Sequence, residues 1–304
     1  MDALDNPRRL LLVHAHPDDE SITTGATIAH YAASGAAVTL VTCTRGERGE
    51  VIPSELAELE GDGEALAEHR TEELAAAMEA LGVADHRFLG SDAGVRFEDS
   101  GMAYDEQGRA VAALDTPPGA FSKVPVDDAA GHLVRVLRQV RPQVVVTYEP
   151  GGGYGHPDHV HAHRVAVRAV ELAADPGYGE DEIWAVSRVA ETVVPRSVFD
   201  SGMQALAQEG LPTLAGVGVV PTTVVPDEQV DVVVDAGEQR EAKAAALRAH
   251  ATQVVVTGST FALSNGLHQP LTGVEYYRLA TGPGRRDESL ATPLTDLFAG
   301  LPSA

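Results

Sequence analysis

Histidine side chains gather in two short windows of the sequence. Two of the 12 histidines are His14 and His16, and four more follow much later in the chain: His156, His159, His161 and His163. Each window comes just after a short apolar run of strand length. In an open α/β sheet, ligands bind outside the carboxyl ends of the strands. We therefore expect the two windows to meet at one rim of a sheet.

The first window reads HAHPDDE from His14 onward. Alternation along a strand would place His14 and His16 on the same face, and Pro17 biases His16 toward an extended backbone. Asp18 and Asp19 then point in different directions, so one carboxylate can bind a metal while the other stays free. An Asp that caps the following helix accounts for one of these carboxylates better than for both.

The second window reads YGHPDH from Tyr154 onward, after a Gly-rich turn at 151–153 that can bring backbone close to a ligand. Pro157 suits the first turn of a helix, which places His159 in that turn and facing the rim. Asp158 or another acid could orient a metal-bound histidine by a hydrogen bond. The other histidines of the two windows are interpreted as structural: His14, which holds the site together, and His161 and His163.

Two histidines and one carboxylate leave a coordination position open for water, which is typical of catalytic rather than structural zinc. Zinc lowers the pKa of its water to about 7 and so makes a nucleophile at neutral pH. A second carboxylate can take the proton of this water and return it to a leaving nitrogen. A phenol such as Tyr154 can donate to the oxyanion. The same donor set also suits ferrous iron.

Strand and helix patterns alternate through the first half of the chain. We expect strands at 10–13, 37–43, 86–89 and 144–147, and helices at 24–33, 65–81, 129–140 and 157–173. This alternation predicts an α/β fold with a mostly parallel sheet and helices on both faces. Residues 90–128 lack a long periodic run and are interpreted as an active-site loop. The acidic run 55–64 is interpreted as a solvated loop or helix start.

The C-terminal part is expected to form a smaller α/β subdomain. Its patterns predict strands at 183–194, 218–225, 230–234 and 274–279, and a helix at 236–249. We therefore divide the chain into a catalytic domain at 1–177 and a smaller subdomain at 178–304 that closes the pocket.

Charge and cysteine content exclude several classes of function. The formal net charge of -23 makes nucleic acid a poor partner and would repel an anionic membrane. Cys43 is the only cysteine, which excludes an intrachain disulfide and a zinc site with two thiolates. The apolar run 10–13 is too short for a signal peptide and no run of about 18 apolar residues exists. We expect a cytoplasmic protein that acts on a small molecule; its oligomeric state stays open.

Several stretches of the sequence together resemble one family. VHAHPDDES, ATIAHY, VTCTRGERGEV, DSGM, GGYGHPDHVHAH, AHATQVVV and ALSN are similar to the LmbE-like (PIG-L) zinc-dependent deacetylases, and most of all to the members that act in mycothiol biosynthesis. The resemblance implies a Rossmann-like domain without dinucleotide binding, and no G-x-G-x-x-G follows the first strand here. It also implies hydrolysis of N-acetyl-glucosaminyl-inositol to the free amine and acetate.

The resemblance also implies roles for residues of both windows. His16, Asp19 and His159 would bind one zinc ion per subunit, and Asp18 would be the general base.

Further roles follow from the same resemblance. His156 would be a general acid or a group that polarises the substrate, and Tyr154 would stabilise the oxyanion. Arg70 and Asp99 match sugar-binding positions, and Glu50 would line the pocket. Read from the sequence alone, Arg70 is equally a surface charge of a helix and Asp99 a turn former.

Three other functions fit parts of the sequence. The amidase that cleaves mycothiol S-conjugates resembles this chain over both windows, but members of that type tend to carry a lysine where this chain has Thr23. A non-catalytic sugar-binding protein would not need a free acid such as Asp18 beside a complete ligand set. A nicotinamide oxidoreductase is disfavoured by the missing glycine fingerprint.

Overall fold

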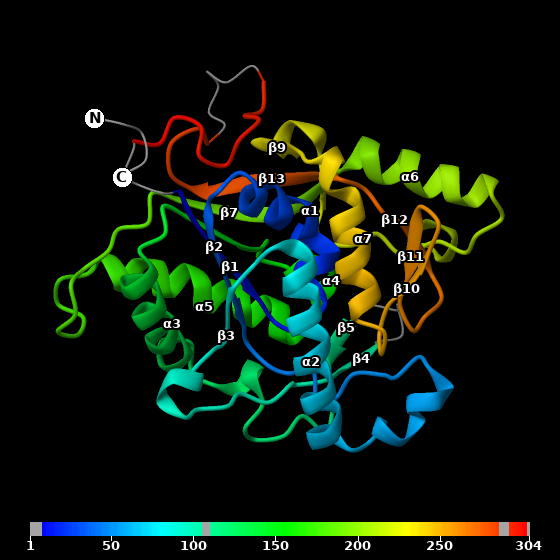
Figure 1. Ribbon diagram of the computed structural model, residues 1–304, viewed down its shortest axis with the longest axis horizontal. Helices are drawn as coiled ribbons and strands as arrows, with labels where there is room; N and C mark the ends of the chain where they lie inside the picture. The colour runs from blue at the N-terminus through cyan, green and yellow to red at the C-terminus, as the bar shows by residue number, and fades with distance from the viewer. Residues whose placement is uncertain (1–7, 105–109, 286–291, 303–304) are drawn as a thin grey trace.

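An eight-stranded sheet forms the centre of the molecule (Figure 1). The structure, a computed structural model, describes residues 8–104, 110–285 and 292–302. Seven strands lie in the order β3-β2-β1-β6-β7-β13-β9, and β8 pairs with β7. The strands are β1 (Arg9–His14), β2 (Ala37–Thr42), β3 (Asp85–Phe88), β6 (Val144–Tyr148), β7 (Arg188–Pro195), β8 (Val224–Val225), β9 (Val232–Asp235) and β13 (Val274–Thr281).

Most neighbouring strands of this sheet are parallel, which confirms the predicted fold class. β3, β2, β1, β6 and β7 all run the same way, whereas β13 is antiparallel to both β7 and β9. Two small sheets lie apart: β4 (Met102–Tyr104) with β5 (Ala110–Ala112), and β10 (Val255–Thr257), β11 (Thr260–Ala262) and β12 (His268–Pro270). These five short strands were not predicted.

Helices cover both faces of the central sheet. They are α1 (Asp19–Ala33), α2 (Gly63–Leu81), α3 (Val126–Val140), α4 (Gly152–Gly155), α5 (Pro157–Ala174), α6 (Arg196–Gln208) and α7 (Arg240–Ala249). Side chains alternate along β1, so Leu10 and Leu12 pack with α1, α2 and α7, while Leu11 and Val13 pack with α3 and α5. Both cores are fully apolar where they meet β1, which is why this strand reads as a continuous hydrophobic run.

The strand order places a topological switch between β1 and β6. From β1 the chain moves outward to β2 and β3, and it then returns to the other side of β1 to form β6 and β7. Leu10, Leu11 and Leu12 pair with Val144, Val145 and Val146. Since the two strands are parallel and in register, their carboxyl ends lie side by side. Ligand crevices in doubly wound sheets form at such a switch.

Several predicted boundaries differ from the structure. Helix α1 begins at Asp19, five residues before the expected start, because its first turn is polar and buried rather than apolar. Of the run 218–225 only Val224–Val225 is strand, and helix α6 was not predicted. The acidic run 55–64 contains a short 3-10 helix at Ser54–Leu59 and the first residues of α2.

The central sheet continues across the predicted domain boundary at 177/178. β7, β8, β9 and β13 follow that boundary in sequence, yet β7 pairs directly with β6 and β13 pairs with β7. The division into two domains stays a prediction. Within the described residues we find no helix that combines the length and the hydropathy of a membrane span.

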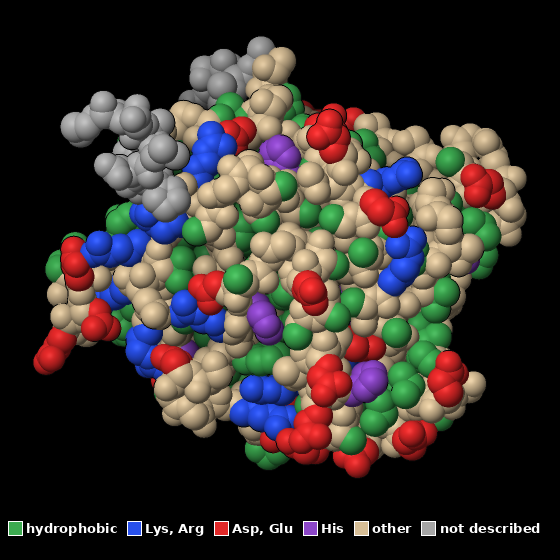
Figure 2. Space-filling model, in the orientation of Figure 1, with side chains coloured by type: hydrophobic (Ala, Val, Ile, Leu, Met, Phe, Trp, Pro, Cys, Tyr) green, Lys and Arg blue, Asp and Glu red, His purple; other side chains and the backbone are tan. Residues whose placement is uncertain are grey.

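Acidic side chains are prominent on the face shown in Figure 2. Red side chains gather along its lower edge, near α2 and the segment before it. The exposed acids of this segment and of the first turn of α2 are Glu55, Glu58, Glu60, Asp62 and Glu64. They agree with the acidic net charge and with the prediction that this run is solvated.

A buried ion pair joins α7 to β13. Lys243 of α7 lies 2.7 Å from Glu275 of β13, with side chains 3% and 4% exposed. The Glu275 carboxylate also accepts hydrogen bonds from the backbone N–H groups of Ala26 and Thr27 in α1. A side chain thus replaces part of the ordinary helix ladder in the middle of α1.

We predict that Lys243→Met destabilises the fold by about 3–5 kcal/mol, because it leaves the Glu275 charge buried without its partner. The matched control is Arg248→Met on the same helix, whose pair with Glu241 is exposed and should change stability by less than about 1 kcal/mol. Urea unfolding at equilibrium measures both. Equal, small changes for the two variants would contradict the prediction.

Candidate metal centre and active site

The first histidine window forms the turn between β1 and α1. β1 ends at His14, whose Nε2 atom lies 3.0 Å from Thr24 Oγ1 in α1. The chain then turns, so strand alternation does not extend to His16, and the two rings have different partners. Asp18 stands before the helix with φ 118°, a left-handed backbone that costs a non-glycine residue of order 1–3 kcal/mol. Such strain is characteristic of functional sites.

The second window follows β6. Glu149 comes directly after the strand, and its carboxylate accepts hydrogen bonds from the backbone N–H groups of Gly151 (2.6 Å) and Gly153 (2.9 Å). These two hydrogen bonds hold the Gly-rich turn at 151–153, which overlaps the start of α4. Helix α5 then starts at Pro157, as predicted, and His156 caps it by accepting a hydrogen bond from Asp158 N at 3.1 Å.

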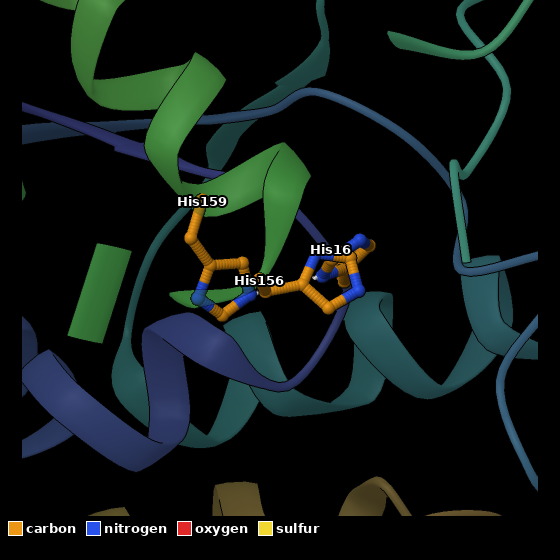
Figure 3. A group of neighbouring side chains, drawn as sticks. All are labelled: His16, His156 and His159. Carbon is orange, nitrogen blue, oxygen red and sulfur yellow. Dashed lines mark hydrogen bonds between the residues drawn. The ribbon is translucent and has the colours of Figure 1, made fainter. Parts of the chain in front are cut away.

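The two windows converge at the switch point, where Figure 3 shows His16, His156 and His159 gathered together. His16 Nδ1 lies 3.2 Å from His159 Nε2 and 3.3 Å from Asp19 Oδ2. His159 Nε2 lies 3.3 Å from the same Asp19 oxygen. The three atoms therefore form a nearly equilateral triangle, in which His159 lies more than 130 positions along the sequence from His16 and Asp19.

Hydrogen bonds behind the triangle orient both rings. His159 Nδ1 lies 3.1 Å from the carbonyl oxygen of Gly152. A carbonyl only accepts, so the proton is on Nδ1 and the lone pair of Nε2 faces the triangle. His16 Nε2 lies 3.3 Å from Asp158 Oδ2, and Asp158 is fully buried and hydrogen-bonded by Ser100. A carboxylate or carbonyl behind each ring is the arrangement found around metal-bound histidines.

The donor set fits a divalent metal ion. Ligands of a tetrahedral zinc ion, with bonds of about 2.0–2.2 Å, lie roughly 3.3 Å apart, which agrees with the observed triangle. The His159 lone pair and the Asp19 carboxylate are both acceptors at contact distance, so a cation between them relieves their repulsion.

Asp18, His156 and Tyr154 surround the triangle. Burial, together with the charge of Asp19, raises the pKa of Asp18 to about 8. The Asp18 carboxylate makes no hydrogen bond within the part of the chain that the structure describes. The His156 ring lies 4.6 Å from that of His16, and the Tyr154 ring 5.1 Å from that of His159. Because His156 Nδ1 accepts a hydrogen bond, its Nε2 carries the proton in the neutral ring and can donate.

Tyr148 is a site residue that the sequence analysis missed. This buried side chain is the last residue of β6, and its hydroxyl accepts from Ala15 N and donates to Asp19 Oδ2 at 2.7 Å. Its ring stacks on His159 at 4.4 Å and meets the edge of His14 at 5.3 Å. Tyr148 thus links the two windows. The available signal was its position at the strand end, two residues before the Gly-rich turn.

Arg70 is buried, contrary to its reading as a surface charge. Its guanidinium donates to the carbonyl oxygens of Gly46 and Glu50 at 2.7 and 3.1 Å, while its Nε has no partner. The close approach requires glycine, since a Cβ at Gly49 would lie 2.2 Å from Arg70 Nη1. Arg70 therefore holds the loop after β2.

Asp99 is also buried, and it forms a turn as the sequence suggested, because its Oδ1 accepts a hydrogen bond from Gly101 N at 2.8 Å. Its Oδ1 atom lies 3.6 Å from His16 Nε2, and although burial opposes it, His16 holds the pKa of Asp99 below its ordinary value. Asp99 and the exposed Glu50 both line a cavity of about 650 Å³ beside the triangle. Two other groups that contain His16 lie close enough to hold an ion: one with His156 and His159, and one with Asp99 and Asp158. In the second group Ser100 donates two hydrogen bonds to Asp158.

Comparison with known proteins agrees with this geometry. A protein from Streptomyces griseus subsp. griseus named 1D-myo-inositol 2-acetamido-2-deoxy-alpha-D-glucopyranoside deacetylase is 55% identical, over 98% of this chain and 90% of its own. A protein of the same name from Kineococcus radiotolerans is 51% identical, over 99% and 85%. The solved structure of N,N'-diacetylchitobiose deacetylase from Pyrococcus horikoshii superposes with a TM-score of 0.54 at 21% identity, covering 81% and 70%, and so supports the fold.

The family described as PIG-L, GlcNAc-PI de-N-acetylase, matches residues 11–170, which span both histidine windows and the switch point between β1 and β6. This match covers more than half of the chain, and the relatives extend the likeness to nearly its full length. The chain belongs to the PIG-L family.

Proposed function

We propose that this protein is a metal-dependent hydrolase that deacetylates 1D-myo-inositol 2-acetamido-2-deoxy-α-D-glucopyranoside to the free amine and acetate, a step of mycothiol biosynthesis. The observation that carries the proposal is the triangle of His16, Asp19 and His159 with the unbonded carboxylate of Asp18 beside it. Relatives that share 50–55% of their residues with nearly the whole chain carry the name of this activity.

His16, Asp19 and His159 would hold the metal, with zinc as the first candidate and ferrous iron as the alternative. When bound, the ion supplies Lewis acidity and lowers the pKa of a water molecule to about 7. Asp18 accepts the proton of the attacking water and passes it to the amine that leaves, a transfer that contributes about 10²–10⁴-fold to the rate.

His156 and Tyr154 complete the proposed chemistry. The Nε2–H group of neutral His156 donates to the substrate carbonyl or to the leaving group, and burial beside His16 and His159 favours this neutral form by lowering its pKa well below 6.5. The hydroxyl of Tyr154 donates to the oxyanion. Such a donor is worth about 2.7–4 kcal/mol in other enzymes. Asp158 and His14 would support the site from behind.

The 650 Å³ cavity next to Asp99 is the proposed binding place of the sugar and inositol rings. Asp99 and Glu50 offer carboxylate acceptors to hydroxyl groups. Arg70 shapes the wall from behind by holding the loop of Gly46 and Glu50. The acidic surroundings agree with an uncharged substrate and with the expectation that nucleic acid is not a partner.

The alternative substrate is a mycothiol S-conjugate, which offers a related amide. Thr23, at the position where the conjugate amidases tend to carry lysine, faces the start of α1 and donates to Asp19 O at 2.8 Å. This chain therefore lacks the cation that the amidases carry there, which favours the deacetylase. The cytoplasm remains the expected location.

We predict that Asp18→Asn lowers kcat by about 10²–10⁴-fold while the protein keeps its metal, because the side chain keeps its shape and loses its basicity. Steady-state kinetics and metal analysis of the same preparations measure the two quantities. If the variant loses its metal in proportion to its rate, Asp18 is a ligand rather than the base.

We predict a graded loss of metal affinity at the triangle. His159→Ala removes a ligand and should weaken metal binding by several orders of magnitude. Tyr148→Phe keeps every ligand and removes the hydrogen bonds of the hydroxyl to Asp19 and Ala15, so it should weaken metal binding by about 10–100-fold. Competition with a chromogenic chelator measures both. Wild-type affinity of the alanine variant would place the metal elsewhere.

We predict acetate release from the acetylated inositol glycoside that stops with a chelator and returns with added Zn²⁺ or Fe²⁺. The kcat/KM for this substrate should exceed that for a mycothiol S-conjugate under the same metal loading. A higher value for the conjugate would favour the amidase. Absence of turnover on any N-acyl sugar, with metal bound, would favour a non-catalytic binding protein.

A further inference from the structure

A fully buried polar cluster lies behind the turn that carries Asp18. Glu20 and His250 are both 0% exposed, and His250 Nε2 lies 2.8 Å from Glu20 Oε1 although 230 positions separate them. The same Glu20 oxygen accepts a hydrogen bond from Ser21 Oγ at 2.6 Å. His250 comes directly after α7. Burial of an ionisable pair costs free energy, so packing alone does not account for this pair.

Two side chains hold the peptide group between Pro17 and Asp18, one at its N–H and one at its carbonyl oxygen. Glu20 Oε2 accepts a hydrogen bond from Asp18 N at 3.0 Å. The side-chain amide of Gln253 donates to Pro17 O. The N–H of Asp18 and the carbonyl of Pro17 belong to the same peptide group. Its plane therefore cannot rotate without breaking one of these bonds, and rotation of this plane is what would relax the φ of 118° at Asp18.

The segment that supplies His250 and Gln253 is itself anchored. Thr252 lies between them, and its N–H and hydroxyl both donate to the Glu73 carboxylate of α2, at 2.7 and 2.6 Å. His250 and Gln253 therefore belong to a segment that is anchored to α2. The Asp18 carboxylate, in contrast, makes no hydrogen bond in the described part of the chain, so its direction is set by its backbone alone.

We propose that Glu20, His250 and Gln253 are positioning residues, and that they aim the Asp18 carboxylate at the attacking water by clamping the Pro17–Asp18 peptide. The inference rests on the proposed role of Asp18 as the general base. A misplacement of about 1 Å in a reacting group can cost about 10²-fold in rate. Loss of the clamp therefore lowers kcat without removing any metal ligand.

Two variants test the clamp, one on each end of the peptide. Gln253→Met keeps the volume of this half-buried side chain and removes its donor, and Glu20→Gln removes a charged acceptor. Each should lower kcat by about 10–100-fold, with KM and bound metal as in the wild type. The control is Gln139→Met, the same exchange at an exposed position of α3, which should leave kcat unchanged.

Combination with Asp18→Asn separates positioning from general damage. In that background each clamp variant should change the residual rate by less than about 2-fold, because the group it acts through is already gone. An equal loss in both backgrounds, or wild-type kcat for Gln253→Met, overturns the clamp. If Asp18→Asn itself keeps the wild-type rate, Asp18 is not the general base, and the proposed positioning role of the clamp is contradicted with it. Should Glu20→Gln not fold, the Gln253→Met cycle decides alone.

Discussion

The pairing of β1 with β6 is the constraint on which the site depends. Parallel register brings Leu12 beside Val146, and the two strands then end at the same rim. Each is followed at once by one of the two histidine windows: the turn with His16 after β1, and the Gly-rich turn that leads to His159 in α5 after β6. A slip of one residue would turn every side chain of the strand to the opposite face and would separate His16 from His159. The apolar cores on both faces of β1 therefore determine the geometry of the polar centre, which one of them contacts through Tyr148.

The polar centre is held by bonds that run between segments distant in sequence. Tyr148 connects the end of β6 to Asp19, Asp158 of α5 supports His16, and His250 supports Glu20. Each group is buried, so each missing bond would leave an unsatisfied polar atom. This makes the arrangement of the ligands a property of the whole fold, which is consistent with a site that is formed before metal arrives.

Sequence reasoning predicted the parallel strands and most helices closely, because apolar runs and periodicity are local signals. It placed the start of α1 too late, since buried polar residues such as Glu20 and Ser21 do not read as a helix face that packs inward. It missed Tyr148, because an aromatic residue at a strand end is read as core. The burial of Arg70 and the partnership of Glu20 with His250 were beyond reach, since neither contact leaves a periodic trace in one sequence. The metal-ligand roles implied by resemblance stay predictions that the observed triangle supports.

The position of β13 affects the order in which the central sheet can form. This strand comes last in the chain but lies between β7 and β9, and its Glu275 binds the backbone of α1. During translation, a nascent chain that lacks β13 leaves β7 and β9 with open edges, which are sites of unwanted association. At that stage α1 also lacks the hydrogen bonds that its Ala26 and Thr27 N–H groups donate to Glu275. The anchor at Glu275 therefore follows both histidine windows in the sequence, so α1 gains its central contact only after those windows have been made.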